Sequence, residues 1–178
     1  MHLRIKDKYP IVITRDLNKA KDWVRSKCQG TTRYGLLASS GALRLKPEGI
    51  FVKNDVPVEN WFLNCKDDVR SSYMLEDVVT EFDIQGLELD YSVVAWDADY
   101  RYTNGKWTYN NFVGNRWNSV SSEERKLYLK NAYRVLLTRA RQGMAIFVPY
   151  GNENDATRPP EFYDGVYNYL KSIGVEEI

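Results

Sequence analysis

Two arginines at the end of a basic segment are the residues best suited to chemistry. The segment from Asn131 to Arg141 ends an apolar helical pattern with Arg139 and Arg141, beside the hydroxyl of Thr138. A guanidinium stays protonated and offers a planar fork of donors, so a pair of them on a rigid element favours a nucleotide or nucleic-acid phosphate as partner. A solvated basic helix end that complements the helix dipole would contain the same residues.

An earlier segment carries the opposite charge. From Glu76 to Asp99 every ionisable side chain except tyrosine is acidic, whereas from Arg125 to Arg141 every ionisable side chain except tyrosine is basic. Segments of opposite charge attract each other, or they surround a charged ligand that both contact. We therefore expect the two segments either to face one another or to face a phosphate and a metal ion together.

The elements that must position these residues alternate between strand and helix. Pro10 to Asp16 is rich in β-branched residues, a helical apolar pattern runs from Leu17 and stops at Gly30, and Tyr34 to Ser39 is typical of a buried strand. This order predicts a βαβ unit with a parallel pairing. The stretch from 41 to 72 has no steady period and indicates irregular surface structure with short elements.

The second half of the chain continues the alternation. Tyr91 to Trp96 is the clearest strand, Met144 to Pro149 predicts another, and Tyr163 to Ile173 predicts a terminal helix. Ser121 with Glu124 forms a capping box that opens a further helix. The apolar stripe of that helix is Leu127 or Tyr128, Ala132, Val135 and Leu136. Strands and helices at this spacing predict a layered α/β fold with a mainly parallel sheet.

An aromatic β-hairpin is predicted between the core strands. Asn104-Gly105 is a strong hairpin turn signal, and it places an inserted ribbon at about residues 99–118. The aromatic residues of the ribbon are suited to stacking on unpaired bases, but aromatic cross-strand pairs also stabilise an isolated ribbon, which favours packing on the domain. They are Tyr100, Tyr102, Trp107, Tyr109, Phe112 and Trp117.

Composition limits the class of protein. A chain of 178 residues with 43% apolar residues predicts one globular domain over 1–178. Its 25 basic and 24 acidic residues give net charge +1, so any nucleic-acid contact must be local. Cys28 and Cys65 suggest neither a disulfide framework nor a zinc site, and the single histidine, His2, excludes catalysis by a histidine-paired nucleophile. No apolar run has membrane or signal length, so we expect a cytoplasmic protein without membrane contact.

The two charged segments together resemble known motifs. Thr80 to Asp90 and Leu137 to Arg141, each beside a core strand, resemble the fifth and sixth motifs of superfamily 1 helicases in order and spacing. The likeness is greatest to uncharacterised bacterial helicase-like proteins related to the Schlafen C-terminal helicase region, from about Pro10 onward. Such proteins have two RecA-like (P-loop NTPase-like) domains with ATP between them. The resemblance implies that this chain is the second domain, the C-terminal motor half of an ATP-dependent DNA or RNA helicase or translocase.

The resemblance also implies roles at the nucleotide. Arg139 matches the catalytic arginine finger, which neutralises charge on the γ-phosphate as it is transferred to water. Gln85, Gly86 and Glu88 match the segment near ATP, and Arg141 would be a supporting cation there. Phosphoryl transfer needs positioned positive charge more than covalent chemistry, so an arginine that arrives only when two domains close would couple hydrolysis to motion.

Nucleic-acid contacts are implied for Thr80 and, beside the arginine finger, for Thr138. No residue is assigned to a metal. The sequence contains no Gly-x-x-x-x-Gly-Lys-Ser/Thr loop, since its one Gly-Lys pair is Gly105-Lys106 in the predicted hairpin turn. We therefore expect ATP with Mg²⁺ to be bound mainly by an N-terminal RecA-like domain of the same protein, and this part alone to be inactive as an ATPase.

Two other functions are compatible with the sequence. A metal-dependent nuclease would use Asp97 and Asp99, at the end of a core strand, together with Glu88 as Mg²⁺ ligands. A carboxylate pair at that place is also a common loop cap. A non-catalytic interaction module derived from a helicase domain is the other alternative.

Overall fold

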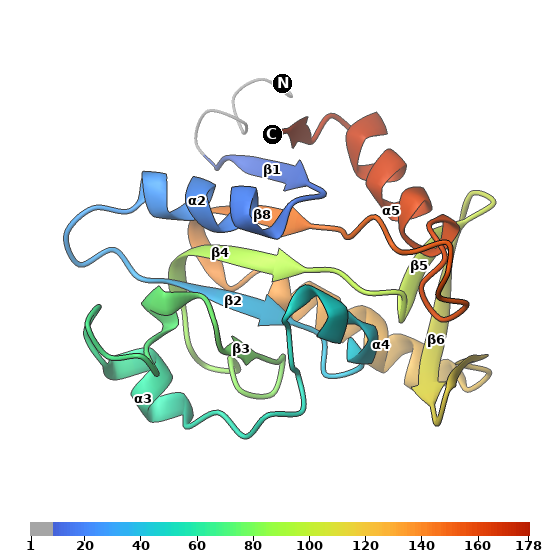
Figure 1. Cartoon of the computed structure of the whole chain (residues 1–178), viewed down its shortest axis with the longest axis horizontal. Helices are drawn as coiled ribbons and strands as arrows, with labels where there is room; N and C mark the ends of the chain where they lie inside the picture. Colours follow the sequence, from blue (N-terminus) through green and yellow to red (C-terminus); the bar gives the residue numbers. More distant parts are fainter. Residues whose placement is uncertain (1–8) are drawn as a thin grey trace.

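A six-stranded sheet of parallel strands forms the centre of the fold. The computed structural model describes residues 9–178 (Figure 1). The strands are β1 (Ile11–Thr14), β2 (Tyr34–Ala38), β3 (Val78–Val79), β4 (Leu89–Ala95), β8 (Ala140–Phe147) and β9 (Glu176–Glu177). They lie in the order β3-β2-β4-β8-β1-β9. The predicted α/β class and mainly parallel sheet are confirmed, and the arrangement is consistent with a RecA-like layered fold.

Successive residues of the central strands fill two separate cores. In β2 and β4, Leu36 and Val93 pack on one face of the sheet, whereas Leu37 and Val94 pack on the other. Neighbouring side chains of a strand point to opposite faces, so a strand covered on both sides needs an unbroken apolar run. The apolar runs of β2 and β4 therefore place both strands inside the sheet.

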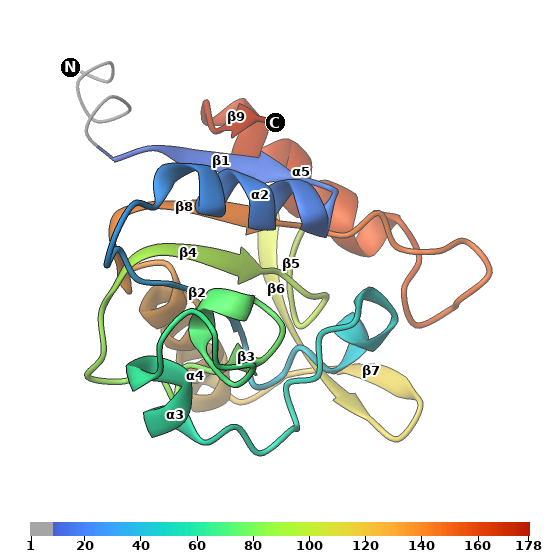
Figure 2. The same cartoon turned by 60° about the vertical axis from the view of Figure 1, so that its left-hand side comes forward.

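Helices cover both faces of the sheet (Figures 1 and 2). The first core contains Ala20 and Val24 of α2 (Leu17–Lys27), together with residues of the 3₁₀ helices η1 (Leu43–Glu48) and η2 (Ser72–Met74). The second core contains residues of α3 (Val58–Leu63), α4 (Glu123–Leu136) and α5 (Glu161–Ser172). The Asp16 carboxylate caps α2 by accepting from the N–H groups of Asn18 and Lys19, at 2.8 and 3.2 Å. The result is a three-layer α/β/α arrangement.

The predicted direct pairing of the first two strands is wrong. β1 pairs with β8 and β9, while β2 pairs with β3 and β4, so β4 and β8 separate them. The strands are parallel and connected through α2 as expected. Local periodicity predicts each strand but not which strands lie beside it. Here β4 and β8, which come later in the chain, insert between β2 and β1.

The predicted hairpin is a three-stranded antiparallel ribbon. It consists of β5 (Tyr100–Thr103), β6 (Lys106–Val113) and β7 (Arg116–Ser119). Asn104 and Gly105 form its first turn with φ of 50° and 77°, the positive values that this kind of turn requires. Tyr102 and Trp107 pack against Tyr169 of α5. Their ring centroids lie 4.4 and 5.3 Å, respectively, from that of Tyr169. The aromatic residues at this end therefore pack on the domain, as the cross-strand argument favoured.

The helix before the candidate arginines differs from its prediction at both ends. Ser122, not Ser121, caps α4, because its hydroxyl accepts from the N–H of Arg125 at 3.4 Å. Leu127 and Tyr128 are exposed, and the buried side chains are Ala132, Tyr133 and Leu136. The helix ends at Leu136. Arg139 therefore lies in the turn after the helix, and Arg141 lies in β8.

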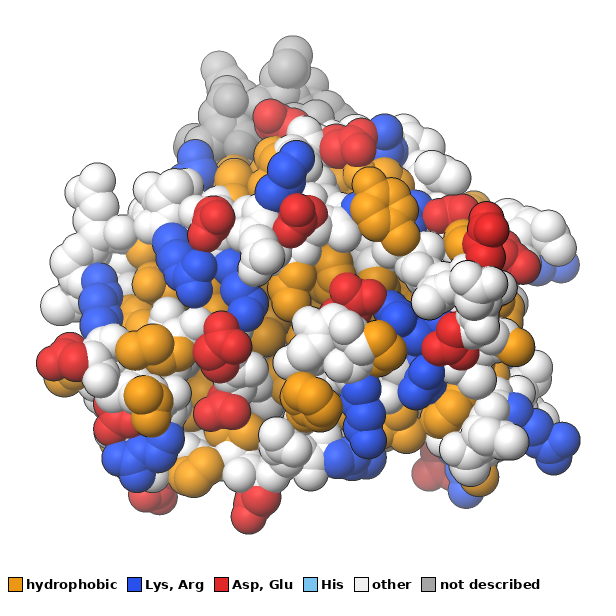
Figure 3. Space-filling view, in the orientation of Figure 1, with side chains coloured by type: hydrophobic (Ala, Val, Ile, Leu, Met, Phe, Trp, Pro, Cys, Tyr) orange, Lys and Arg blue, Asp and Glu red, His pale blue; other side chains and the backbone are white. Residues whose placement is uncertain are grey.

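Two further features concern the edges and surface of the molecule. The edge strands β3 and β9 have two residues each, and β9, which the sequence did not predict, joins the sheet beside β1. Basic and acidic side chains are interspersed on the face shown in Figure 3. No helix within residues 9–178 is long and apolar enough to cross a membrane. His2 lies outside the described residues.

Candidate functional site

The two motif segments meet at one edge of the sheet. Leu89, the first residue of β4, pairs with Ala140, the first residue of β8, and the N–H of Leu89 donates to the carbonyl of Arg139 at 3.0 Å. We call the side where the parallel strands begin the amino edge and the opposite side the carboxyl edge. In Figure 1 the arrowheads of β1, β2 and β4 point toward the carboxyl edge. Gly86 to Glu88 and Thr138 to Arg141 therefore lie together at the amino edge.

An ion pair holds Arg141 at this edge. Its Nη2 is 2.9 Å from Oδ1 of Asp90, and its Nε is 4.0 Å from Oε2 of Glu88. The same Asp90 oxygen accepts from Gln142 at 2.9 Å, and Oδ2 accepts from the backbone N–H of Arg33 at 2.8 Å. Burial alone would raise the pKa of Asp90, but these hydrogen bonds outweigh it and hold that pKa below its usual value. The expected approach of the acidic and basic segments is thus found here.

Asp90 is a residue that the sequence reasoning missed. Its signal was its place at the start of the strand that follows Glu88, opposite a segment rich in arginine. Because parallel neighbouring strands begin side by side, a carboxylate there was positioned to meet Arg141. Asp90 orients Arg141, while the Arg141 side chain stays 61% exposed.

Arg139 differs from Arg141 in having no side-chain partner among residues 9–178. Its side chain is half-buried, and its Nε is buried without a hydrogen-bond partner. Within residues 9–178 the Arg139 guanidinium makes no side-chain hydrogen bond or ion pair. A buried donor left unpaired is costly, on the order of 1–3 kcal/mol, and a charged one more so. The arrangement therefore leaves a positioned cation available to an anion from outside the domain.

The remaining predicted nucleotide residues lie on the same approach. Gln85 and Gly86 are exposed in the turn that leads to Glu88, which is also exposed. Gly86 has a φ of 83°, a left-handed value that disfavours residues with a Cβ atom. The turn needs glycine for its backbone conformation whether or not a nucleotide approaches it.

The two predicted nucleic-acid residues are at different places. Thr138 lies in the exposed turn after α4, where its hydroxyl donates to the carbonyl of Arg134 at 2.8 Å. Thr80 follows β3 and so lies toward the carboxyl edge, 7% exposed. Its hydroxyl and its backbone N–H each donate to Oδ2 of Asp83 at 2.8 Å. The structure therefore brings Thr138 to the arginines and leaves Thr80 apart from them.

The carboxyl edge contains a buried polar network. Asp99 accepts from the hydroxyls of Tyr133 and Ser39 at 2.5 and 2.7 Å. Asp97 accepts from the hydroxyl of Tyr163 at 3.0 Å and from the backbone N–H of Arg44 at 2.8 Å. Burial and then the neighbouring Asp97 raise the pKa of Asp99 to about 7, and burial also raises that of Asp97. These carboxylates serve as internal acceptors.

The nuclease interpretation is not supported by this geometry. Asp97 and Asp99 follow the carboxyl end of β4, whereas Glu88 precedes its amino end. Within residues 9–178 no group of three or more His, Cys, Asp or Glu side chains is placed to hold a metal ion. Glu88 and the two aspartates are close in the sequence, but the length of β4 separates them in the structure.

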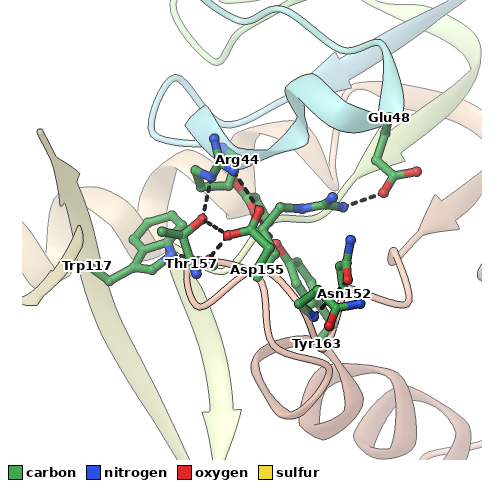
Figure 4. Close-up of polar contacts among 10 residues, drawn as sticks. Arg44, Glu48, Trp117, Asn152, Asp155, Thr157 and Tyr163 are labelled. Carbon is green, nitrogen blue, oxygen red and sulfur yellow. Dashed lines mark hydrogen bonds and ion pairs between the residues drawn. The ribbon is translucent and has the colours of Figure 1, made fainter. Parts of the chain in front are cut away.

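The loop between β8 and α5 is fastened over the carboxyl edge (Figure 4). Arg44 of η1 donates to Asp155 at 2.8 Å and to Thr157 at 2.7 Å. Arg158 pairs with Glu48 of the same 3₁₀ helix. Trp117 of β7 donates its indole N–H to the carbonyl of Thr157 at 2.8 Å. The loop thereby connects the ribbon, η1 and α5 into one polar assembly.

The fold and the joined segments define a helicase-like region. The chain belongs to the Schlafen group 3, DNA/RNA helicase domain family, whose model matches residues 2–150. The matched range contains both motif segments and ends before α5. A comparison with curated proteins and one with solved structures found no match.

Proposed function

We propose that this chain is the C-terminal motor half of an ATP-dependent DNA or RNA helicase or translocase. The observation that supports the proposal most directly is Arg139, a half-buried arginine without an internal ion pair in the described residues, at the amino edge where the two motif segments meet. Such an arginine has its donors free for an external anion. Membership in a helicase domain family makes a nucleotide phosphate the expected anion.

The other residues of the amino edge would assist Arg139. Arg141, fixed by Asp90 and 61% exposed, adds a second positive charge. Gln85, Gly86 and Glu88 lie on the exposed turn beside it, where a side-chain amide and a carboxylate suit the polar parts of a nucleoside. This donor set fits an anionic nucleotide and lacks the phosphate-cradling loop, so a second domain would complete the site.

Positioned charge is the catalytic contribution of this domain. When bound, ATP with Mg²⁺ supplies the phosphoryl group that passes to water. Arg139 would stabilise the negative charge that develops on the transferred group. Because Arg139 lies at the surface of its own domain, it would reach that group only when an N-terminal RecA-like domain closes on the amino edge. Hydrolysis would thus be coupled to domain movement.

Thr80 and Thr138 would contact the nucleic-acid backbone. The Thr80 hydroxyl donates to Asp83, and a phosphate oxygen only accepts, so Thr80 would exchange this bond for one to the phosphate when nucleic acid binds. Because Thr80 lies toward the carboxyl edge, the nucleic-acid track would reach the side of the sheet opposite Arg139.

The test is an ATPase measurement on the protein that contains both motor halves. Arg139→Ala should lower kcat on the order of 10³-fold, as arginine fingers contribute 10³ to 10⁵, and should change nucleic-acid affinity little. Lys130→Ala, which removes an exposed positive charge from α4, is the matched control and should leave kcat within about twofold.

A near-normal ATPase rate in the Arg139→Ala protein, with thermal unfolding unchanged, would remove the catalytic role. If the two-domain protein has no nucleic-acid-stimulated ATPase at all, the motor proposal itself fails, and an interaction module becomes the better account.

A further inference from the structure

A polar cavity opens at the carboxyl edge, on the opposite side of the sheet from Arg139. Its volume is about 510 Å³, which is within the usual range for pockets that bind small organic groups. It lies between the loop after β2, the segment after Thr80, strands β6 and β7 of the ribbon, and the first turns of α4. No residue assigned to the nucleotide lines it.

Neutral hydrogen-bonding groups dominate the walls of the cavity. The ribbon contributes Asn110, Asn111 and Asn118 to the lining, and serines line the opposite side and the entrance to α4. Arg125 is the one cation in the lining, against the carboxylates of Glu81 and Asp99. The buried Glu81 carboxylate would repel phosphate, so the lining favours an uncharged group with many polar edges.

The two carboxylates are fixed acceptors. Oε1 and Oε2 of Glu81 accept from the hydroxyl and the N–H of Ser40, at 2.6 and 2.8 Å. Asp99 is held by Tyr133 and Ser39. Glu81 and Asp99 are 7% and 1% exposed. Both Asp99 oxygens are engaged inside the protein, whereas each Glu81 oxygen has two lone pairs and keeps the capacity to accept one more hydrogen bond. The cavity therefore has preorganised acceptors for N–H donors of a ligand.

Aromatic rings stand at the mouth of the cavity. Tyr128 lines it and is 48% exposed, and Phe82, which is 60% exposed, lies beside it with ring centroids 6.0 Å apart. Neighbouring exposed aromatic rings are a platform on which a flat base can stack. In the ribbon, Tyr100 and Trp107 pack on Trp96, and Tyr102 and Trp107 pack on Tyr169 of α5, so these rings fix the ribbon against the domain.

We propose that this cavity receives an unpaired nucleobase, stacked on Tyr128, whose amino group donates to Glu81. The inference rests on the proposed function for the presence of a nucleic-acid strand and adds the place and the chemistry of base recognition. Carboxylate acceptors suit the exocyclic amino group of cytosine, whereas uracil presents a carbonyl at the same position. The cavity should therefore prefer cytosine to uracil.

The experiment measures binding of the 178-residue chain to fluorescently labelled oligocytidine and oligouridine of equal length, by anisotropy and without ATP. We expect the chain to bind oligocytidine about tenfold more tightly, the lower end of discrimination by a good polar contact. Glu81→Gln should reduce the preference below about threefold, because an amide can serve either base. Glu124→Gln, an exposed change on the same helix entrance, should keep it.

Stacking is tested separately. Tyr128→Ala should weaken binding to both oligonucleotides about tenfold, whereas Leu127→Ala, equally exposed on α4 but outside the cavity, should not. Equal affinity for the two strands, absence of binding, or no effect of Tyr128→Ala in a folded protein would each overturn the inference. None of these results depends on Arg139, so the base site and the motor proposal are tested independently.

Discussion

The two edges of the sheet treat their charged side chains differently. At the amino edge Arg141 is exposed and Arg139 has no internal partner in residues 9–178, whereas at the carboxyl edge Asp97 and Asp99 are buried and hydrogen-bonded. Charges that are satisfied internally build structure, and charges left open are available for ligands. Mutations at the amino edge should therefore change activity more than stability, and those in the buried network at the carboxyl edge should do the reverse.

The largest expected effect on stability comes from the pH dependence of Asp99. Its pKa is about 7 in the folded protein, compared with 3.8 for an unperturbed aspartate. The folded state therefore binds the proton more tightly, so this contribution to stability is fully present below about pH 4 and is lost as pH rises through 7. The difference between a pKa of 3.8 and one of about 7 corresponds to roughly 4 kcal/mol.

Urea unfolding between pH 5 and 8 measures this contribution. Asp99→Asn should flatten the decline in the free energy of unfolding across that range. The pKa of Asp97 is raised as well and Asp97 interacts with Asp99, so the difference between the two proteins reports Asp99 together with its coupling to Asp97. An unchanged slope would mean that Asp99 is ionised in the fold and would weaken the contrast between the two edges.

The next effect concerns the docking of the ribbon on α5. A Cβ atom at Gly165 would lie 1.8 Å from the carbonyl oxygen of Tyr102, which is backbone and cannot turn away. Gly165→Ala should lower the free energy of unfolding by about 3 kcal/mol, although alanine in a helix normally adds up to about 1 kcal/mol. Asn168→Ala, exposed on the same helix, is the control. A stabilised Gly165→Ala protein would show that the ribbon is not held there.

The smallest effect is expected from Asp90→Asn at the amino edge. The change removes the charge that holds Arg141, but an amide can still accept from the N–H of Arg33. Because Arg141 is exposed, the stability loss should be about 1 kcal/mol or less and should shrink in high salt. In the two-domain protein the ATPase rate should fall by more than the stability loss suggests. If only stability changes, Asp90 is structural and the contrast between the edges is weaker.

The sequence predicted the parts of the molecule that depend on local pattern. The apolar run of β4, the apolar register at the end of α4, and the turn at Asn104-Gly105 follow from periodicity or backbone preference, and the structure contains them. The order of two motif segments beside two parallel strands was enough to bring Glu88 and Arg141 together.

What the sequence did not predict depends on contacts between distant segments. The separation of β1 from β2, the partner Asp90, and the cavity between the ribbon and α4 arise only when whole elements pack. Ser121 is the better cap by pattern, because Glu124 follows three residues later, but in the structure the hydroxyl of Ser122 caps α4. A window of a few residues contains too little information to predict these contacts.

The short outer strands have a consequence for assembly. Strands β3 and β9 contribute two residues each, and β9 consists of two glutamates. Short edge strands with charged side chains discourage backbone pairing with another chain. Sheet continuation is therefore a poor way to join this domain to a neighbour, and any second motor half would have to meet it across the strand ends, where hinge motion does not break β-ladders.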